Sequence, residues 1–192
     1  PSLGRVVVDD VDISSFSEDG LARFRREHCG FVFQQIHLLD GLSVMDNVMA
    51  VGLLTNRNRA QVRQRADELF DLVGLGAADR RKFPSMLAGG EAQRVGIVRG
   101  IINGPAVLFA DEPTGQLNSD YGRLVLDLLS QVHANGQTVV MVTHDLKSAA
   151  RGDRILYLRD GSITSEIDLR HLPQDERERM PVAAAFLAEM GW

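Results

Sequence analysis

The sequence predicts an α/β fold in which parallel strands alternate with helices. Three short apolar runs, at residues 106–110, 138–142 and 154–158, have the pattern of β-strands. A helical pattern at residues 121–132 separates the first two runs. Strands that alternate with helices form a parallel sheet covered by those helices, so we expect that architecture here.

The remaining segments surround this sheet with further strands and helices. Their predicted order is a strand at 5–8 leading into a surface connection, a helix from about Glu18, a strand at 31–33, a helical region at 42–99, a hairpin strand at 162–167, a charged connection at 175–179 and a helix at 181–190. Within the helical region, Ser43 and Asn58 are candidate N-caps, because a side-chain oxygen there accepts a backbone N–H of the first turn.

The composition is that of a globular domain with one substantial core. Of 192 residues, 44% are hydrophobic and 24% are charged. The formal net charge of −5 gives no basic excess, so we expect no nucleic-acid partner. The single cysteine, Cys29, cannot form an internal disulfide, which fits a reducing compartment. Because no apolar run approaches the ~20 residues of a membrane helix, we expect a cytoplasmic location with membrane association only through a partner.

A pair of carboxylates ends one of the predicted strands. Asp111 and Glu112 directly follow the apolar run at 107–110. Ligands of open α/β sheets bind at the carboxyl ends of strands, so these acids are placed to meet a substrate. An aspartate there can hold Mg²⁺, and the adjacent glutamate can deprotonate an attacking water in phosphoryl transfer. The alternative, commoner for an isolated match, is that the acids cap the next helix or face solvent.

Paired glycines open a predicted helix that runs to about residue 101. The segment reads Leu87-Ala88-Gly89-Gly90-Glu91. Backbone N–H groups at a helix N-terminus bind anions, and glycine lets a phosphate approach closely. The segment therefore predicts a phosphate contact, although a plain Gly-Gly turn would have the same sequence.

A histidine follows a third predicted strand. His144 comes directly after the run at 138–143. An imidazole at a strand end can donate a hydrogen bond to a γ-phosphate oxygen. A lone histidine more often has no such role, so this residue gains weight only from the other motifs.

Together with Gln34, which follows the strand at 31–33, these motifs stand in the order found in ABC ATPases. Over at least residues 4–163 the chain resembles the nucleotide-binding subunit of an ABC transporter. The resemblance implies a RecA-like P-loop NTPase core of ABC type with an inserted α-helical subdomain. It divides the chain into a first part of the core at 1–35, a helical signature subdomain at 36–99, a second part of the core at 100–170 and a C-terminal tail helix at 171–192.

The resemblance also implies roles for individual residues. Gln34 matches the Q-loop glutamine, which touches Mg²⁺ and the attacking water in the family. Asp111 and Glu112 match the Walker B aspartate, a further Mg²⁺ contact, and the catalytic glutamate. His144 matches the switch histidine, which senses the γ-phosphate. These residues would thus serve MgATP binding and hydrolysis.

A second set of residues is implied to meet the nucleotide held by an opposite subunit. The set comprises Ala88, Gly89, Gly90 and Glu91 of the signature motif and Asn118 of the D-loop region. The implied partners are a second ABC ATPase subunit, in a homo- or heterodimer that sandwiches two ATP molecules, and a membrane permease that holds the subunit at the inner face of the cell membrane. The runs at 31–39 and 111–115 resemble the branch that powers lipoprotein release and macrolide export.

Three departures from the family pattern stand out. Walker A, G-x-x-x-x-G-K-[ST], needs a Gly-Lys pair, and neither of the two lysines, Lys82 and Lys147, follows a glycine. Family order places that loop before Pro1, so we expect an N-terminal truncation and no ATPase activity from this chain alone. Ala88 replaces the usual serine, whose hydroxyl binds the γ-phosphate in the family. The missing hydrogen bond to a charged group would weaken that contact by roughly 1.5 to 3 kcal/mol. Asn118 replaces the usual aspartate but keeps an acceptor.

These departures keep two alternatives open. One is a degenerate, non-catalytic subunit that contributes structure and interface to a more competent partner, although Glu112 and His144 argue against full degeneracy. The other is a soluble ABC protein acting on ribosomes or DNA, which the absence of a second cassette, a basic stretch or a long coiled-coil insertion disfavours. Gly96 and Gly100, inside the predicted signature helix, each cost about 1 kcal/mol relative to alanine, and the sequence offers no proof of a packing reason.

Overall fold

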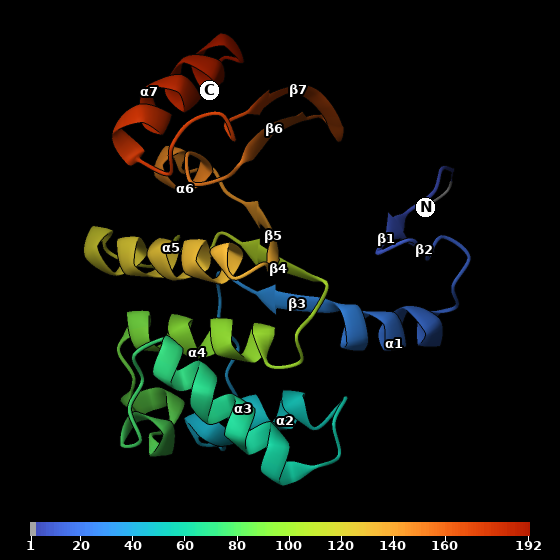
Figure 1. The fold of residues 1–192 in the computed structure, drawn as a ribbon, viewed down its shortest axis with the longest axis vertical. Helices are drawn as coiled ribbons and strands as arrows, with labels where there is room; N and C mark the ends of the chain where they lie inside the picture. Colours follow the sequence, from blue (N-terminus) through green and yellow to red (C-terminus); the bar gives the residue numbers. More distant parts are fainter. Residues whose placement is uncertain (1–2) are drawn as a thin grey trace. The chain divides into compact units, whose positions relative to one another are not determined.

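The computed structural model describes residues 3–192, which form two compact units (Figure 1). The boundary follows Val140, so that it falls within β5 (Thr138–Val142). The other elements of the first unit are β1 (Val7–Val8), β2 (Val11–Asp12), α1 (Glu18–His28), β3 (Cys29–Val32), α2 (Val44–Gly52), α3 (Arg59–Leu72), η1 (Asp79–Arg81), η2 (Pro84–Met86), α4 (Gly89–Ile101), β4 (Val107–Asp111) and α5 (Ser119–Ala134). The second unit holds α6 (Leu146–Ala149), β6 (Arg154–Arg159), β7 (Ser162–Asp168) and α7 (Glu176–Glu189).

The predicted parallel sheet is confirmed for β4 and its neighbour β3, whereas β6 pairs antiparallel with β7 in a separate two-stranded sheet. Cys29 lies opposite Val107 and Val32 opposite Ala110, and the order of the sheet is β3-β4-β5. Side chains alternate between the two faces, so Val32, Leu108 and Ala110 are buried while Phe31 and Phe109 are only half-buried. On this second face the Phe31 ring stacks on Phe33 and on Phe109, with centroids 5.7 and 5.6 Å apart. Phe33 remains 41% exposed.

Helix α4 packs on the buried face of β3 at a distance that only glycine allows. A Cβ built on Gly30 would lie 2.2 Å from the carbonyl oxygen of Gly100, and one built on Gly100 would lie 3.1 Å from the carbonyl oxygen of Phe31. A Cβ built on Gly96 would lie 3.1 Å from the Ile36 side chain, a tight contact with a side chain and not with backbone. The two glycines inside the helix therefore have a packing reason, which the sequence alone did not provide.

This close approach makes Gly30 sensitive to the smallest side chain. We expect Gly30→Ala to lower the free energy of unfolding by about 2 kcal/mol, because the added methyl meets backbone and must push α4 away from the sheet. Chemical denaturation followed by circular dichroism measures this. Gly41→Ala is the matched control, since a Cβ there has no atom within 4 Å. A similar loss in both variants would contradict the packing argument.

Helices α2 and α3 start at the predicted caps and pack on α4 (Figure 1). The Ser43 hydroxyl accepts the Asp46 N–H at 3.1 Å, and the Asn58 side chain accepts the Ala60 N–H at 3.1 Å. Hydrophobic residues at helical spacing then fill the interior between the helices. In the described part of the chain no helix is long and apolar enough to cross a membrane.

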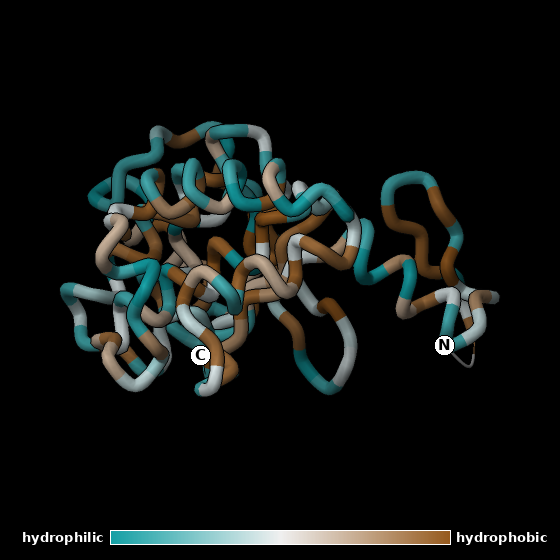
Figure 2. The backbone as a smooth tube through the Cα atoms, turned by 90° about the horizontal axis from the view of Figure 1, so that it is seen from below, coloured by the Kyte–Doolittle hydropathy of each residue, from teal (hydrophilic) through white to brown (hydrophobic). Residues whose placement is uncertain are grey.

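The N-terminal segment forms a hairpin where a single strand and a surface connection were predicted. β1 and β2 pair antiparallel, and the turn between them is made by Asp9 and Asp10 with φ angles of 51° and 61°. Aspartate tolerates this left-handed conformation better than most residues because its short side chain hydrogen-bonds locally. The hairpin also carries hydrophobic residues, which are brown in Figure 2. Among them, Val7 is 52% exposed.

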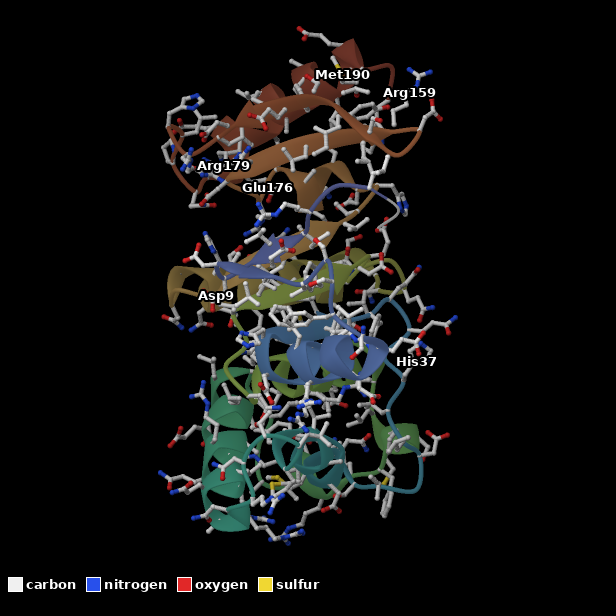
Figure 3. The ribbon with its side chains drawn as sticks, turned by 90° about the vertical axis from the view of Figure 1, so that its right-hand side faces the viewer. Asp9, His37, Arg159, Glu176, Arg179 and Met190 are labelled. Atoms are coloured by element: carbon white, nitrogen blue, oxygen red, sulfur yellow. The ribbon has the colours of Figure 1, made fainter. Side chains whose placement is uncertain are left out.

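In the second unit, the prediction of a charged connection at 175–179 is wrong. Helix α7 starts at Glu176 with Asp175 as its N-cap, so these charges form its first turn. Arg179 is 2% exposed and donates to the carbonyls of Gly152, before β6, and Leu169, after β7 (Figure 3). The helix was predicted to start at Pro181, which instead lies inside it.

Candidate functional site

Asp111 and Glu112 form a turn at the carboxyl end of β4. Asp111 is the last residue of the strand and is exposed, whereas Glu112 is partly buried. Glu112 has a φ of 43°, a left-handed conformation that is uncommon for a residue with a side chain. Its carbonyl accepts the N–H of Gly115 at 3.1 Å, which closes the turn. Strained residues of this kind concentrate at functional sites, so the turn is a candidate for one.

Gln34 lies against the same turn. It follows β3, the neighbour of β4 in the sheet, and its side chain occupies the space beside Gly115. A Cβ built on Gly115 would be 2.8 Å from Gln34 Nε2. The structure thus brings Gln34 together with the segment that follows Asp111 and Glu112.

The segment around Gln34 is held by helix α4. Gln93, which is 2% exposed, donates to the Phe33 carbonyl at 3.3 Å. Arg99 donates to the carbonyls of Ile36 and His37, the latter at 2.8 Å, and His37 has a φ of 49°. Burial lowers the pKa of Arg99 from its ordinary value, but a guanidinium stays charged at every physiological pH. Residues 33–37 are therefore fastened to the signature helix on both sides of Gln34.

Gln93 and Arg99 were not among the predicted site residues. Their signal was nevertheless present, since Gln93, Gly96 and Arg99 recur every three positions along the helix. Positions three apart lie on neighbouring parts of one helix face. That face meets the loop after β3.

The N-terminus of α4 carries the remaining signature residues. Ala88 is the exposed N-cap and offers no side-chain acceptor. The Glu91 carboxylate accepts the Ala88 N–H at 2.9 Å and lies 3.5 Å from Lys82 Nζ. Lys82 also binds Asp79 at 2.7 Å. Glu91 therefore has a structural role at the helix start, whatever else it does.

The paired glycines differ in their surroundings. Gly90 is buried, and a Cβ there would come within 2.7 Å of the Tyr121 ring. Gly89 is exposed, and its Cβ would meet only Leu117 at 3.5 Å, an ordinary contact. Packing against α5 accounts for glycine at position 90, but no tight contact with the described residues accounts for it at position 89.

Asn118 stands at the start of α5, beside the signature helix. Its Oδ1 accepts the Tyr121 N–H at 3.0 Å, so it is the N-cap. The contacts of Gly89 with Leu117 and of Gly90 with Tyr121 show that the N-termini of α4 and α5 adjoin. The D-loop residue thus lies near the signature glycines of its own chain.

His144 lies in the second unit, directly after β5. It is exposed, and the next residue, Asp145, caps α6 by accepting the Ser148 N–H at 2.8 Å. The Asp145 N–H in turn donates to Thr143 Oγ1 at 3.0 Å. Hydrogen bonds thus hold the turn that follows His144, while the role of the imidazole stays a prediction.

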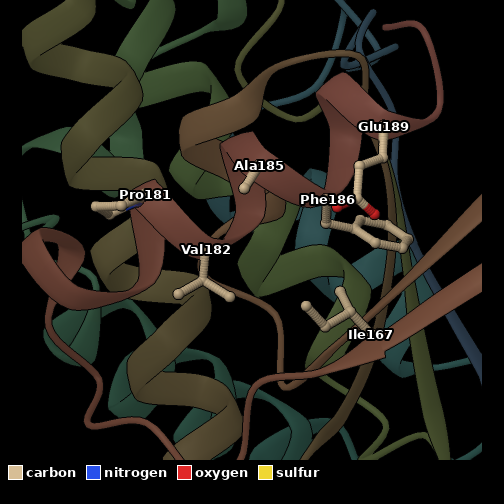
Figure 4. A pocket seen from close by; sticks show the side chains of 6 residues that line it. All are labelled: Ile167, Pro181, Val182, Ala185, Phe186 and Glu189. Atoms are coloured by element: carbon tan, nitrogen blue, oxygen red, sulfur yellow. The ribbon is translucent and has the colours of Figure 1, made fainter.

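One hollow of the second unit is lined by none of the predicted site residues. It is an open groove of about 390 Å³ in the second unit, lined by Ile167 of β7 and by residues of α7 (Figure 4). The α7 residues are Pro181, Val182, Ala185, Phe186 and Glu189. The described residues also contain no group of three or more His, Cys, Asp or Glu side chains that could hold a metal ion. Any cation at the Asp111 turn would need further ligands.

The sequence profile of the ABC transporter family matches residues 1–115. The chain belongs to the ABC transporter family. The ABC transporter match runs through Gln34, the signature motif and the Asp111 turn, and ends at Gly115.

Curated ABC transporter relatives include two macrolide export proteins. The chain is 42% identical over 166 residues to the macrolide export ATP-binding/permease protein MacB of Shewanella sp. (strain ANA-3), covering 86% of this chain and 25% of that protein. It is 44% identical to MacB of Escherichia coli, with 86% and 26% covered. The chain therefore spans about a quarter of the length of the curated relatives it matches.

Solved ABC transporter structures share the fold. The dimeric structure of MJ0796, a bacterial ABC transporter cassette, matches with a TM-score of 0.77 at 36% identity, covering 88% of this chain and 75% of that one. CbiO1 of Clostridium perfringens, part of the transporter complex CbiONQ, matches with a TM-score of 0.79 at 25% identity, covering 89% and 68%. The predicted ABC-type α/β fold is thus confirmed.

Proposed function

We propose that the chain is part of an ATP-binding and ATP-hydrolysing subunit that drives a membrane permease. The observation that carries this proposal is the position of Gln34 beside the turn that contains Asp111 and Glu112. An amide, a carboxylate that can bind a cation and a second carboxylate that can accept a proton are the groups that phosphoryl transfer to water needs. The fold is shared with MJ0796, for which a dimeric post-hydrolysis state bound to ADP and Pi is known.

Asp111 and Gln34 fit a magnesium ion that also binds phosphate. Both offer oxygen donors, and both side chains belong to exposed residues. Mg²⁺ at nucleotide sites is held by one or two protein carboxylates together with phosphate and water oxygens, so a cluster of three acids is not required. Bound Mg²⁺ would neutralise the charge of the phosphates. Glu112 would take the proton of the attacking water, and His144 would donate to the γ-phosphate.

Gly89 is proposed to meet the nucleotide of a second subunit. It is exposed at the first position of α4, where backbone N–H groups point outward without intrahelical partners. The proposed phosphate loop would precede Pro1, and each nucleotide would be closed between that loop and the α4 N-terminus of the other subunit. The relatives named as ATP-binding/permease proteins support a permease partner and a peripheral position on the membrane.

Gly89→Ala tests this proposal in a subunit that carries the upstream loop. We expect ATP hydrolysis by the dimer to fall about tenfold, the equivalent of one weakened phosphate contact of roughly 1.4 kcal/mol. The fold should not suffer, because the methyl has room and alanine favours a helix by about 1 kcal/mol over glycine. Steady-state ATPase rates and thermal unfolding measure the two effects. Wild-type turnover in Gly89→Ala, with Gly41→Ala as the control, would contradict the proposal.

A degenerate subunit is the second candidate, favoured by Ala88. The exposed N-cap of the signature helix lacks the hydroxyl that the family normally places there. Reading the genomic sequence upstream of Pro1 for a G-x-x-x-x-G-K-[ST] loop separates the two candidates. The presence of the loop favours the active subunit, and its absence favours the degenerate one.

A further inference from the structure

Gly115 is a glycine whose side-chain position is already occupied by another residue. The three atoms nearest to a Cβ built on Gly115 all belong to Gln34: Nε2 at 2.8 Å, Cδ at 3.4 Å and Cγ at 3.5 Å. Gly115 is exposed and is not among the glycines with a positive φ. Its backbone therefore does not require glycine, and the feature that alanine would disturb is the Gln34 side chain.

The main chain on both sides of Gln34 leaves it little freedom to move away. Gln93 holds the carbonyl of Phe33, and Arg99 holds those of Ile36 and His37. A methyl at position 115 would thus be accommodated by rotation of the exposed Gln34 side chain, not by displacement of its backbone. Such a rotation between staggered rotamers costs little stability, because only the far end of a flexible, exposed side chain moves.

Gly115 also contacts the turn that contains Glu112. Its N–H donates to the carbonyl of Glu112 at 3.1 Å, within the turn that holds Glu112 at its left-handed φ. Alanine keeps this N–H, so a substitution at position 115 separates two effects. In Gly115→Ala the hydrogen bond that closes the turn at Glu112 remains, while the Gln34 amide has to leave its position beside residue 115.

We propose that Gly115 is a positioning residue that sets the location of the Gln34 amide next to the Asp111–Glu112 turn. The consequence for catalysis rests on the proposed function, because it requires that Gln34 serves Mg²⁺ and the attacking water. The location itself is a property of the folded chain. The two can be tested by separate measurements.

The location is tested on the 192-residue chain by NMR. We expect nuclear Overhauser contacts between the Gln34 side-chain amide and the Gly115 α-protons, and their loss with a shifted amide resonance in Gly115→Ala. Gln116→Ala, an exposed neighbour in the same loop, is the control and should leave the Gln34 amide unchanged. An unchanged Gln34 amide in Gly115→Ala would overturn the proposal, whether or not the subunit hydrolyses ATP.

The consequence is tested by a double-mutant cycle in the subunit with its upstream loop. We expect Gly115→Ala and Gln34→Ala each to lower kcat for ATP hydrolysis about tenfold with KM changed less than about twofold, and the double variant to be no slower than Gln34→Ala. If Gly115→Ala lowered kcat by the same factor in the wild-type subunit and in the Gln34→Ala variant, Gly115 would act independently of Gln34. That result would overturn the proposal. Absence of turnover in the wild-type subunit would refute the proposed function instead, and the NMR result would still decide the position.

Discussion

Glu112→Gln is expected to lower ATP hydrolysis by the complete dimeric subunit at least about 100-fold, as loss of a general base does. Gln keeps the shape and branching of Glu, so the left-handed backbone at position 112 is no more strained than before. The amide, however, cannot accept the proton of the attacking water. Nucleotide affinity should change less than about twofold, because the carboxylate acts on the water and not on the phosphates.

Single-turnover hydrolysis and equilibrium nucleotide binding, measured on the same preparation, check this expectation. Asp120→Asn is the matched control, since it removes an exposed carboxylate from the first turn of α5. More than a tenth of the wild-type rate in Glu112→Gln would contradict the assignment of the base. An equal loss of hydrolysis rate in Asp120→Asn would show that removal of any nearby negative charge, and not the loss of a base, slows the reaction.

Arg179→Met is expected to lower the stability of the second unit by about 3 kcal/mol, because it leaves buried polar groups without partners. Methionine replaces the aliphatic stem of Arg179 but cannot donate. The guanidinium donates to four backbone carbonyls at 2.8 to 3.2 Å and lies 3.6 Å from Asp153. These carbonyls belong to Pro173, Gly152, Leu169 and Leu172.

Hydrogen exchange of the β6 and β7 amides reports on this unit, and their protection should fall about 100-fold. Arg177→Met is the matched control on the same helix, because Arg177 is exposed and only its backbone N–H enters the cap. Equal protection in the two variants would show that Arg179 does not hold the unit together. Arg179→Lys should give an intermediate loss, since one ammonium cannot reach carbonyls arranged around a planar fork.

Elements whose signals are local could be predicted closely from the sequence. Ser43 and Asn58 cap the helices expected from them, and α4 runs from Gly89 to Ile101 as its glycines and periodicity indicated. The strand at 138–142 has the predicted bounds. In each case a cap, a glycine or a change of hydrophobic period lies within a few residues of the boundary.

Features that depend on distant parts of the chain could not be predicted. Arg179 is buried because loops 6 to 27 residues away turn their carbonyls toward it, and no pattern near position 179 reveals those loops. The Asp9–Asp10 turn uses a backbone conformation that aspartate adopts only occasionally. For the site, motif order named the residues, but the contact of Gln34 with Gly115 and the anchoring by Gln93 and Arg99 emerged only from the fold.

The close contact between Gly30 and Gly100 limits which residues these two positions can hold. A side chain at Gly30 would meet the backbone of Gly100, and one at Gly100 would meet the backbone of Phe31, so neither position can gain one unless β3 and α4 move apart. A wider spacing between β3 and α4 would require the whole of α4 to move. Gly89 at its start and the loop after β3, which Arg99 binds, would move with it. A substitution at this contact would therefore disturb the signature segment at 87–91 and the loop around Gln34, although neither contains Gly30 or Gly100.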